Sequence, residues 1–152
     1  AAVIYGVTGG VAEAVVRYCL PDKSNNALQA IRVTDLRGDG AIREVNLTVE
    51  GQELHLAIVN GLSHAKELIA DVEAGKRFYH LVEVMTCQGG CVGGAGQPYG
   101  LTAAKKRRGA GLYEADSSAM FKRAEKNPIV TRLLEDYGPD RCHELLHVHY
   151  GE

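Results

Sequence analysis

Residues 83–98 read EVMTCQGGCVGGAGQP, and this stretch decides how the rest of the sequence is interpreted. The mostly apolar run Phe78–Met85 predicts a strand that leads directly into it. Cys87 and Cys91 therefore lie four residues apart at the carboxyl end of a predicted strand, where α/β domains usually place their ligand sites. Glycine has no Cβ and accepts φ > 0, so the six glycines of the loop 83–100 disfavour a regular helix and allow both sulfurs to fold inward.

The spacing of the two thiols suggests metal chemistry but leaves alternatives open. Thiolates are soft ligands suited to iron–sulfur clusters or zinc, and both kinds of site usually need four ligands. On spacing alone, two unrelated thiols on a glycine-rich turn carry equal weight. A redox disulfide is a lesser option, because the usual dithiol spacing is Cys-x2-Cys. Cys19 and Cys142 fall in predicted helices, and we expect both to be buried thiols that act as small hydrophobes.

Length and composition indicate one ordinary domain. The chain has 152 residues, of which 45% are hydrophobic and 24% are charged, and domains commonly run about 100–200 residues. The net charge of −2 argues against a polybasic nucleic-acid surface. No run approaches the ~20 apolar residues of a membrane helix, and 4 cysteines do not make a disulfide-dense framework. We therefore expect no membrane span and a reducing compartment, the cytoplasm, with the periplasm as an open alternative.

The order of the predicted elements indicates an α/β fold. The chain opens with a strand Val3–Gly6, a glycine turn at Thr8-Gly9-Gly10 and a helix Val11–Leu20. The later elements are the strand Ala30–Leu36, an antiparallel hairpin of Ile42–Glu50 and Glu53–Asn60, the helix Ser63–Ala74, the basic helix Leu101–Arg108 interrupted at Gly109-Ala110-Gly111, and two C-terminal helices over 128–150, Pro128–Tyr137 and Asp140–Tyr150. A helix leading directly into a mostly apolar strand fits a sheet covered by helices. We therefore expect residues 1–152 to form a single α/β domain with a mixed sheet flanked by helices.

The stretch 83–98 resembles the third signature of the iron-only (FeFe) hydrogenases, Glu-x-Met-x-Cys-x2-Gly-Cys-x2-Gly-Gly-Gly-Gln-Pro. The matching positions are Glu83, Met85, Cys87, Gly90, Cys91, Gly94, Gly96, Gln97 and Pro98. Residues 5–14 are similar to the family's Phe-Gly-x-Thr-Gly-Gly-Val-Met-Glu-Ala, and residues 111–113, 127–128 and 143–150 resemble its tail. The resemblance covers nearly the whole chain and implies the C-terminal lobe of the hydrogenase catalytic domain.

The resemblance also implies a cofactor and the residues around it. In this family a 4Fe-4S cluster bridged to a two-iron subsite carries out reversible oxidation of H2 and reduction of protons. Cys87 would ligate the four-iron cluster, and Cys91 would ligate it and bridge to the two-iron subsite. Met85, Tyr5 and Gly6 would line the pocket around the two-iron unit. The remaining positions expected to contact the cofactor are Gly9, Gly10, Gly90, Gly94 and Gln97.

Two other signatures of the family are absent from the sequence. Thr-Ser-Cys-Cys-Pro and Met-Pro-Cys-x2-Lys-x2-Glu supply the other two cluster cysteines and the proton-relay thiol. We therefore expect the chain to be the carboxyl-terminal half of a catalytic unit, folded but inactive alone, that shares the cofactor with an upstream half or a companion subunit. A ferredoxin-like electron carrier is implied as a partner. Tyr5 in place of Phe and Ala95 in place of Gly suggest, as a hypothesis, a divergent group tuned for sensing or slow turnover.

Two rival functions stay open. A hydrogenase-related iron–sulfur assembly or scaffold protein would bind a four-iron cluster without a two-iron subsite. The run His143-Glu144-Leu145-Leu146-His147 matches the His-Glu-x2-His pattern of zinc hydrolases. Such a site needs a third ligand and little chain follows, so a histidine-rich packing helix is the favoured interpretation. The basic run Lys105–Arg108 is interpreted as a solvated helix end, because four charges alone bind little.

Overall fold

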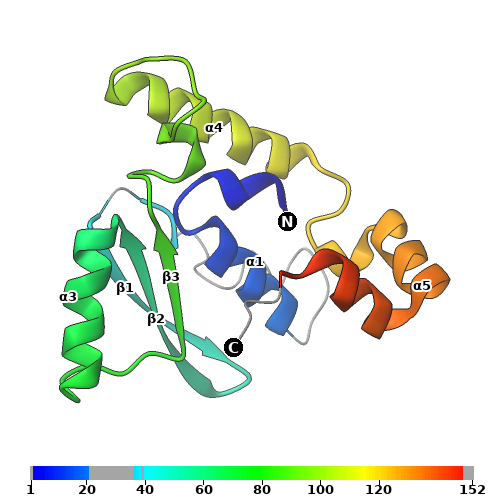
Figure 1. Cartoon of the computed structure of the whole chain (residues 1–152), viewed down its shortest axis with the longest axis horizontal. Coiled ribbons are helices and arrows are strands. Elements are labelled where there is room, and N and C mark those ends of the chain that lie inside the picture. Colours follow the sequence, from blue (N-terminus) through cyan, green and yellow to red (C-terminus); the bar gives the residue numbers. More distant parts are fainter. Residues whose placement is uncertain (1, 21–35, 39, 149–152) are drawn as a thin grey trace.

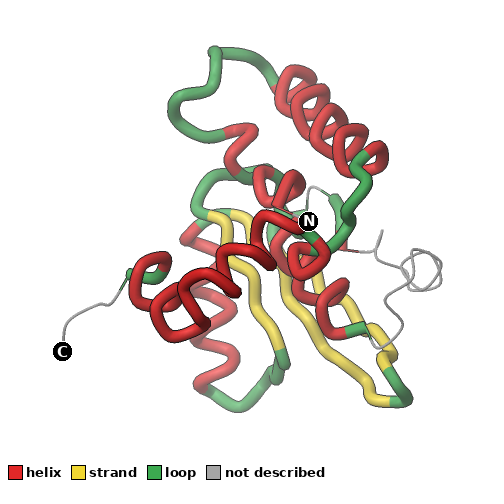
Figure 2. The backbone as a smooth tube through the Cα atoms, turned by 90° about the vertical axis from the view of Figure 1, so that its right-hand side faces the viewer, coloured by secondary structure: helices red, strands yellow, loops and turns green. Residues whose placement is uncertain are grey.

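The centre of the molecule is a mixed β-sheet. The computed structural model describes residues 2–20, 36–38 and 40–148. Within these residues, β1 (Ile42–Val49) pairs antiparallel with β2 (Gln52–Asn60), and β2 pairs parallel with β3 (Leu81–Met85). Figure 2 shows the three strands side by side. The predicted α/β class, the mixed sheet and the antiparallel hairpin are confirmed.

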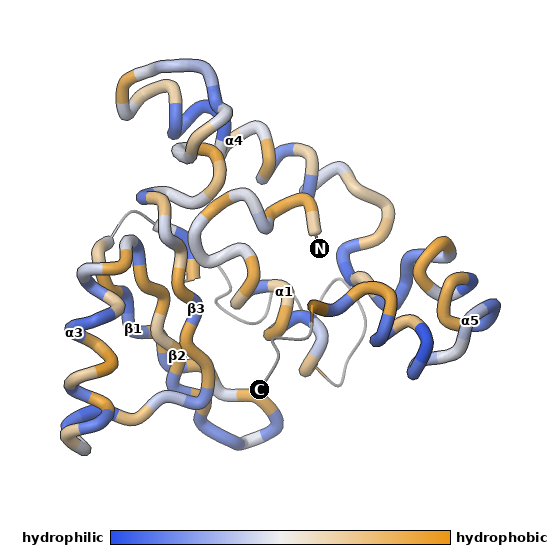
Figure 3. The backbone as a smooth tube through the Cα atoms, in the orientation of Figure 1, coloured by the Kyte–Doolittle hydropathy of each residue, from blue (hydrophilic) through white to orange (hydrophobic). Residues whose placement is uncertain are grey.

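Two helices cover opposite faces of this sheet. In Figure 1, α3 (Leu62–Glu73) lies on one side of the strands and α1 (Gly10–Cys19) on the other. The core on the α1 side consists of Ala12, Val16, Leu36, Val45, Leu47, Leu56 and Ile58. The core on the α3 side consists of Ala57, Val59, Ala65 and Leu68. Residues 56–59 of β2 face both cores in alternation, which explains the continuous apolar run in the middle of the sheet (Figure 3).

The remaining helices of the described chain lie outside the sheet. α4 (Thr102–Ser118) runs along the top of Figure 1, and α5 (Pro128–Leu146) lies beyond α1. The connecting segments contain the short 3-10 helices η1 (Ala2–Gly6), η3 (Cys91–Gly93) and η4 (Ala124–Lys126). A third core cluster joins η1, η3 and α4, and it consists of Ile4, Val7 and Val92 with Leu112 and Tyr113 packed against them. None of the described helices is both long and apolar enough to cross a membrane.

The predicted strand Val3–Gly6 is wrong. These residues form the 3-10 helix η1, in which the Val7 amide donates to the Ile4 carbonyl at 3.1 Å. Ile4 is fully buried against Val7 and Val92, so packing on η3 outweighs the strand propensity of the apolar run. The predicted strand Ala30–Leu36 lies outside the described residues except for Leu36.

The predicted break in the basic helix is also wrong. α4 continues through the glycines at 109 and 111 to Ser118. Gly109 is buried, and a Cβ there would lie 3.3 Å from Val7 Cγ1, so the glycine lets α4 approach η1 closely. This packing offsets the cost of about 1 kcal/mol for a glycine inside a helix. The two predicted C-terminal helices are found as α5, which is kinked at Gly138 and ends at Leu146.

The two cysteines outside the glycine-rich loop behave differently from each other. Cys142 is buried on α5, as predicted, and its Sγ lies 3.5 Å from the Leu133 carbonyl, to which it donates. Cys19 was expected to be buried on α1, but it is exposed. Cys19 is the last residue of α1 and is not among the buried residues of that helix, so the expectation is wrong.

A buried ionic network fastens α4 to α1. The Arg17 guanidinium donates to both carboxylate oxygens of Asp116, at 2.8 and 2.7 Å, and to Glu13 at 2.5 Å. Arg37 donates to both oxygens of the Glu13 carboxylate, to Oε2 at 2.8 Å and to Oε1, which Arg17 also contacts, at 2.7 Å. The side chains of Arg17, Glu13 and Asp116 are all at most 5% exposed. Arg123 adds a hydrogen bond to the Arg17 carbonyl. The charges of α1 therefore meet those of α4 away from water.

This network predicts a loss of stability in acid. Burial works to raise the pKa of Asp116, but the hydrogen bonds and charge of Arg17, helped by Lys122, hold it below its usual value. A carboxyl group with a lowered folded-state pKa stabilises the fold above its unfolded pKa and loses that contribution as pH falls through the folded value. Urea titrations between pH 7 and pH 2 should therefore show stability falling below about pH 4, with a shallower fall in Asp116→Asn. Equal slopes for the two proteins would contradict this assignment.

Candidate functional site

The cysteine loop, residues 83–100, begins inside β3 and leaves the sheet at its carboxyl end, as predicted. Both cysteines are free thiols, Cys87 half-buried and Cys91 exposed. The Gly90 amide donates to the Cys87 carbonyl at 2.9 Å, which forms a tight turn between the two sulfurs. The expectation that both sulfurs fold inward is only half right. Cys91 begins η3 at the surface, so its thiol remains accessible from outside the chain.

The loop is held against the glycine turn of residues 6–10. The Thr8 amide donates to the Gly89 carbonyl at 3.3 Å. Gly90 has φ +89°, and a Cβ there would lie 2.7 Å from the Gly6 carbonyl oxygen and 2.9 Å from the Thr8 nitrogen. Only glycine allows both the left-handed conformation and this approach. The two segments that the family signatures identify in the sequence are therefore in direct contact.

Glu83 is the residue of β3 that anchors this contact. Its carboxylate accepts hydrogen bonds from the Gly9 and Ala12 amides, each at 2.6 Å, and the residue is 6% exposed. These amides belong to the first turn of α1, whose own N-cap residue Gly9 has no side chain to offer. A negative charge at a helix N-terminus is also favoured by the helix dipole. The sequence signature includes Glu83, but the sequence alone indicates no role for this residue.

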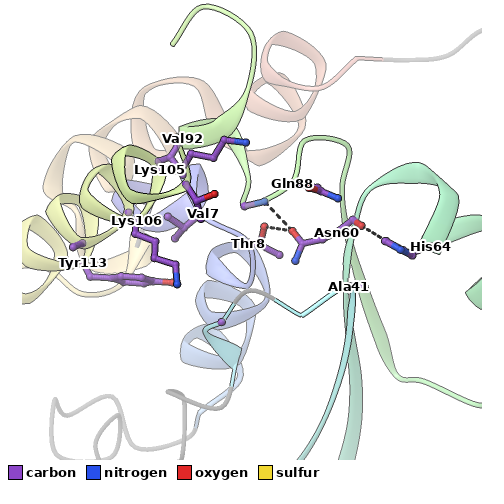
Figure 4. A pocket seen from close by; sticks show the side chains of 15 residues that line it. Val7, Thr8, Ala41, Asn60, His64, Gln88, Val92, Lys105, Lys106 and Tyr113 are labelled. Carbon is purple, nitrogen blue, oxygen red and sulfur yellow. Dashed lines mark hydrogen bonds between the residues drawn. The ribbon is translucent and has the colours of Figure 1, made fainter. Parts of the chain in front are cut away.

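Asn60, at the end of β2, connects three segments and was missed by sequence analysis. Its Oδ1 accepts from the Thr8 hydroxyl at 2.6 Å and from the Gly89 amide at 3.1 Å, and its Nδ2 donates to the Gly40 carbonyl at 2.7 Å (Figure 4). Asn60 is 3% exposed. The available signal was its position, since an amide that ends an otherwise apolar buried strand needs hydrogen-bond partners.

The other predicted site residues spread over the same end of the sheet. Met85 is half-buried, and its carbonyl accepts from the Gly61 amide at 2.6 Å. Tyr5 is 43% exposed on η1. Gly9 and Gly10 are buried in the glycine turn beneath the loop, whereas Gln97 is exposed near the far end of the loop. The structure thus brings the glycine turn to the cysteines but leaves Gln97 apart in the open.

The donor set of the loop fits part of an iron–sulfur site. A Cβ on Gly94 would lie 3.1 Å from Cys87 Sγ, so the glycine leaves room beside that sulfur. In the part of the chain that the structure describes, no group of three or more His, Cys, Asp or Glu could hold a metal ion. Thiolates are soft ligands of the kind that iron–sulfur clusters use, so the two thiols of the loop are chemically suited to supply part of such a ligand set.

The basic run at the start of α4 is less solvated than expected. Arg108 donates to the Val92 carbonyl at 2.9 Å and to the Pro98 carbonyl at 2.5 Å, so it ties α4 to both halves of the cysteine loop. The stem of Lys105 packs over Gly93, where a Cβ would lie 3.1 Å from Lys105 Cδ. Arg107 is exposed, as the sequence predicted. Two of the four basic residues therefore have structural contacts with the loop.

The histidine pair of the zinc-like motif lies on α5. His143 and His147 stack edge to face with ring centroids 4.3 Å apart, and both are exposed. Glu144, the residue that would act as the base, pairs with Arg141 at 2.5 Å. Among the residues that the structure describes, none forms a third ligand group with them. The favoured interpretation of this run as a histidine-rich helix fits these contacts.

Comparison with known proteins identifies the class. Residues 1–95 match the family described as iron only hydrogenase large subunit, C-terminal domain, and residues 102–152 match the iron hydrogenase small subunit. The first match covers more than half of the 152 residues, so the chain belongs to the iron-only hydrogenase family. The resemblance found in the cysteine loop is confirmed.

Individual relatives include hydrogenases and assembly factors. The NADP-reducing hydrogenase subunit HndD of Solidesulfovibrio fructosivorans is 37% identical over 99% of this chain and 26% of its own length. Protein NAR1 of Arabidopsis thaliana is 26% identical over 97% of this chain and 33% of its own length. The solved structure of an apo [FeFe]-hydrogenase HydA1 variant from Chlamydomonas reinhardtii matches with a TM-score of 0.70 and 32% identity, covering 96% of this chain and 45% of that one. The chain thus spans between about a quarter and a third of these curated relatives.

Proposed function

We propose that the chain supplies Cys87 and Cys91 to a 4Fe-4S cluster in an iron-only hydrogenase, with Cys91 also bridging to a two-iron subsite. The observation that carries the proposal is the pair of free thiols on a loop fixed against the glycine turn by Thr8 and Gly90. Family membership supplies the cofactor class. Cys91 is exposed, as a ligand shared with another polypeptide segment would be before that segment covers it.

The remaining ligands and partners belong to the same proposal. The other two cluster cysteines and the proton-relay thiol would come from an upstream half or a companion subunit, because the chain spans only 26% of the hydrogenase subunit HndD. A ferredoxin-like carrier would deliver or accept electrons, with H2 and protons as the substrates. The cysteine count supports a cytoplasmic location.

In the mechanism, the chain would hold the four-iron cluster and shield the cofactor from water. When bound, the cluster and two-iron unit supply the redox chemistry and the splitting or formation of H2. Cys87 and Cys91 would hold the four-iron cluster. The hydrogen bonds that join the Gly89 amide to Asn60 and the Thr8 amide to the Gly89 carbonyl would limit how far the sulfurs can move. Met85 and Tyr5 would cover the two-iron side and exclude water. Rigid support of the ligands tunes a metal site as much as the ligands do.

A second candidate is an iron–sulfur assembly or scaffold protein without a two-iron subsite. It is favoured by the match to Protein NAR1 and by a further relative from Drosophila ananassae, a probable cytosolic Fe-S cluster assembly factor that is 29% identical over 94% of this chain. The hydrogenase relatives are more similar, at 37% and 31% identity over 99% of the chain. We therefore place the hydrogenase role first.

The proposal predicts an iron count that depends on two of the four cysteines. The chain is co-expressed with an upstream half that carries the two other signatures, reconstituted anaerobically, and assayed for iron, sulfide and zinc. About four irons per complex are expected from a four-iron cluster. Cys87→Ser and Cys91→Ser should lower iron to near background, because each removes a thiolate ligand. Cys19→Ser, at the exposed end of α1, is the matched control and should leave the iron count unchanged.

The same experiment separates the candidates. Hydrogen evolution after the two-iron unit is loaded would support the hydrogenase role. A count of about four irons per complex with no hydrogen evolution would instead favour the assembly role. Stoichiometric zinc that disappears in His143→Ala would favour the zinc hydrolase. An iron count that Cys91→Ser does not lower would remove the ligand assignment altogether.

A further inference from the structure

The second half of the cysteine loop has weak internal support. Four of the nine residues from Val92 to Gly100 are glycines, and glycine gives the backbone its widest conformational freedom. Backbone hydrogen bonds inside the loop also lengthen along it, from 3.0 Å between the Gly94 amide and the Cys91 carbonyl to 3.4 Å between the Gln97 amide and the Gly94 carbonyl. The Cys91 thiol is exposed, so its position depends on what holds the residues that follow it.

Arg108 of α4 holds this segment near both of its ends. Its Nη1 donates to the Val92 carbonyl at 2.9 Å, and its Nη2 donates to the Pro98 carbonyl at 2.5 Å. Val92 follows Cys91 directly, and Pro98 lies six residues further along the chain. The two nitrogens belong to one planar, rigid group, so the two carbonyls keep a fixed relation to each other. One side chain from another helix therefore closes the segment that follows Cys91.

The helix that carries Arg108 is itself packed in place. A Cβ on the next residue, Gly109, would lie 3.3 Å from Val7 Cγ1, so α4 lies directly on η1 and the residue after it. Leu112, one turn further along α4, packs against the core cluster that contains Val7 and Val92. Figure 4 shows Val92 beside the first half of α4. The guanidinium is therefore presented to the loop by a packed helix.

Arg108 also brings positive charge to the loop. Within the described residues, the two groups to which it donates are neutral backbone carbonyls, and arginine stays protonated in proteins. A reduced iron–sulfur cluster carries one more negative charge than the oxidised cluster, and nearby charge is one of the factors that set its reduction potential. A cation held one residue from Cys91 favours the reduced form and raises that potential. Arg108 is half-buried, so solvent and salt screen part of the effect.

We propose that Arg108 is a positioning residue of the cluster site, which fixes the loop on the Cys91 side and raises the reduction potential of the cluster. This inference rests on the proposed ligation by Cys87 and Cys91. Arg108 belongs to the segment that matches the iron hydrogenase small subunit, whereas both cysteines belong to the segment that matches the large-subunit domain. The small-subunit segment therefore takes part in the site through this side chain.

The first measurement is amide hydrogen exchange of the cluster-free, 152-residue chain. Arg108→Met should speed the exchange of the Gly93, Gly94 and Gln97 amides about tenfold, because two hydrogen bonds from a charged donor are lost. Arg108→Lys has one nitrogen in place of two and cannot hold both carbonyls, so its exchange should be nearly as fast. Arg107→Met is the matched control, because Arg107 is exposed on the same helix, and it should leave the exchange unchanged. Arg108→Lys decides the point if Arg108→Met does not fold.

The second measurement is the reduction potential of the cluster in the complex with the upstream half, by redox titration with EPR detection. Arg108→Met should shift the potential to a more negative value, because the cation is removed. Arg108→Lys should restore most of that shift, since the charge is kept. Arg107→Met removes the same charge from an exposed position and should shift the potential less. A residue with only a structural role would not give a potential that follows the charge.

Each outcome decides the proposal. Faster loop exchange together with a potential that is lowered in Arg108→Met and restored in Arg108→Lys supports it. Unchanged exchange in both Arg108 variants overturns it, and so does a potential equal to that of the wild type in Arg108→Met. A wild-type complex that takes up no iron contradicts the proposed cluster ligation. The exchange of the cluster-free chain then decides by itself whether Arg108 fixes the loop.

Discussion

Replacing Glu83 with alanine is expected to lower the free energy of unfolding by about 3 kcal/mol. The substitution leaves the Gly9 and Ala12 amides buried without an acceptor and removes a negative charge from the start of α1. A buried donor that loses its partner costs about 1–3 kcal/mol, and the helix dipole adds up to about 2 kcal/mol in a buried geometry. The same change should weaken the attachment of the cysteine loop to the glycine turn, because Glu83 joins β3 to that turn.

Urea denaturation of the wild type, Glu83→Ala and Glu83→Gln measures the first effect, and hydrogen exchange of the Gly9 and Ala12 amides measures the second. Glu83→Gln keeps one acceptor oxygen, so its free energy of unfolding should lie between those of the wild type and Glu83→Ala. Glu67→Ala, on the exposed face of α3, is the matched control and should change stability by less than about 0.5 kcal/mol. A Glu83→Ala protein with unchanged stability and unchanged exchange would show that the two short hydrogen bonds contribute nothing.

Replacing Arg17 with methionine is expected to cost about 3–5 kcal/mol, the range found when one partner of a buried ion pair is removed. Arg17 makes three hydrogen bonds to carboxylate oxygens, two to Asp116 and one to Glu13. Glu13 keeps Arg37 as a partner. Asp116 is 3% exposed, and the side chain of Lys122 acts on its carboxylate more weakly than Arg17 does. Most of the cost should therefore come from the stranded Asp116 carboxylate.

A double variant tests this explanation. Arg17→Met combined with Asp116→Leu removes both charges, and replacing a buried ion pair with apolar side chains is often neutral. The double variant should recover more than half of the stability lost by Arg17→Met. Arg132→Met removes a partner from the exposed pair with Asp136 on α5 and should cost under about 1 kcal/mol. If the double variant is as unstable as the sum of its single variants, the ion pair does not account for the loss.

The fold could be predicted from the sequence wherever local pattern and tertiary packing agree. The alternation over 42–60 and the apolar stripe of α3 specify the hairpin and its covering helix. The pattern failed where long-range contacts decide the local structure. The apolar run around Ile4 forms a 3-10 helix instead of a strand because Ile4 packs on Val92. Helix α4 continues through Gly109 because that glycine packs on Val7. Neither contact can be inferred from neighbouring residues.

The site could be predicted as a set of cysteines but not as a network. The spacing of Cys87 and Cys91 and the glycines around them are visible in the sequence, because they depend on the chemistry of the residues themselves. The supporting hydrogen bonds of Asn60 and Glu83 join residues 20 to 74 positions apart. Such pairs become neighbours only when β2 and β3 lie parallel and bring their carboxyl ends to the same edge.

The ion pair between Arg17 and Asp116 also bears on how the two segments of the sequence evolve together. Arg17 falls in the segment that matches the large-subunit family, and Asp116 falls in the segment that matches the small-subunit family. If a gene were split between residues 96 and 101, one product would carry a cation and the other an anion at surfaces built to exclude water. Each product would be poorly folded without the other. Selection would then act on the two charges as a pair, so a change of sign at one position is tolerable only with the reverse change at the other.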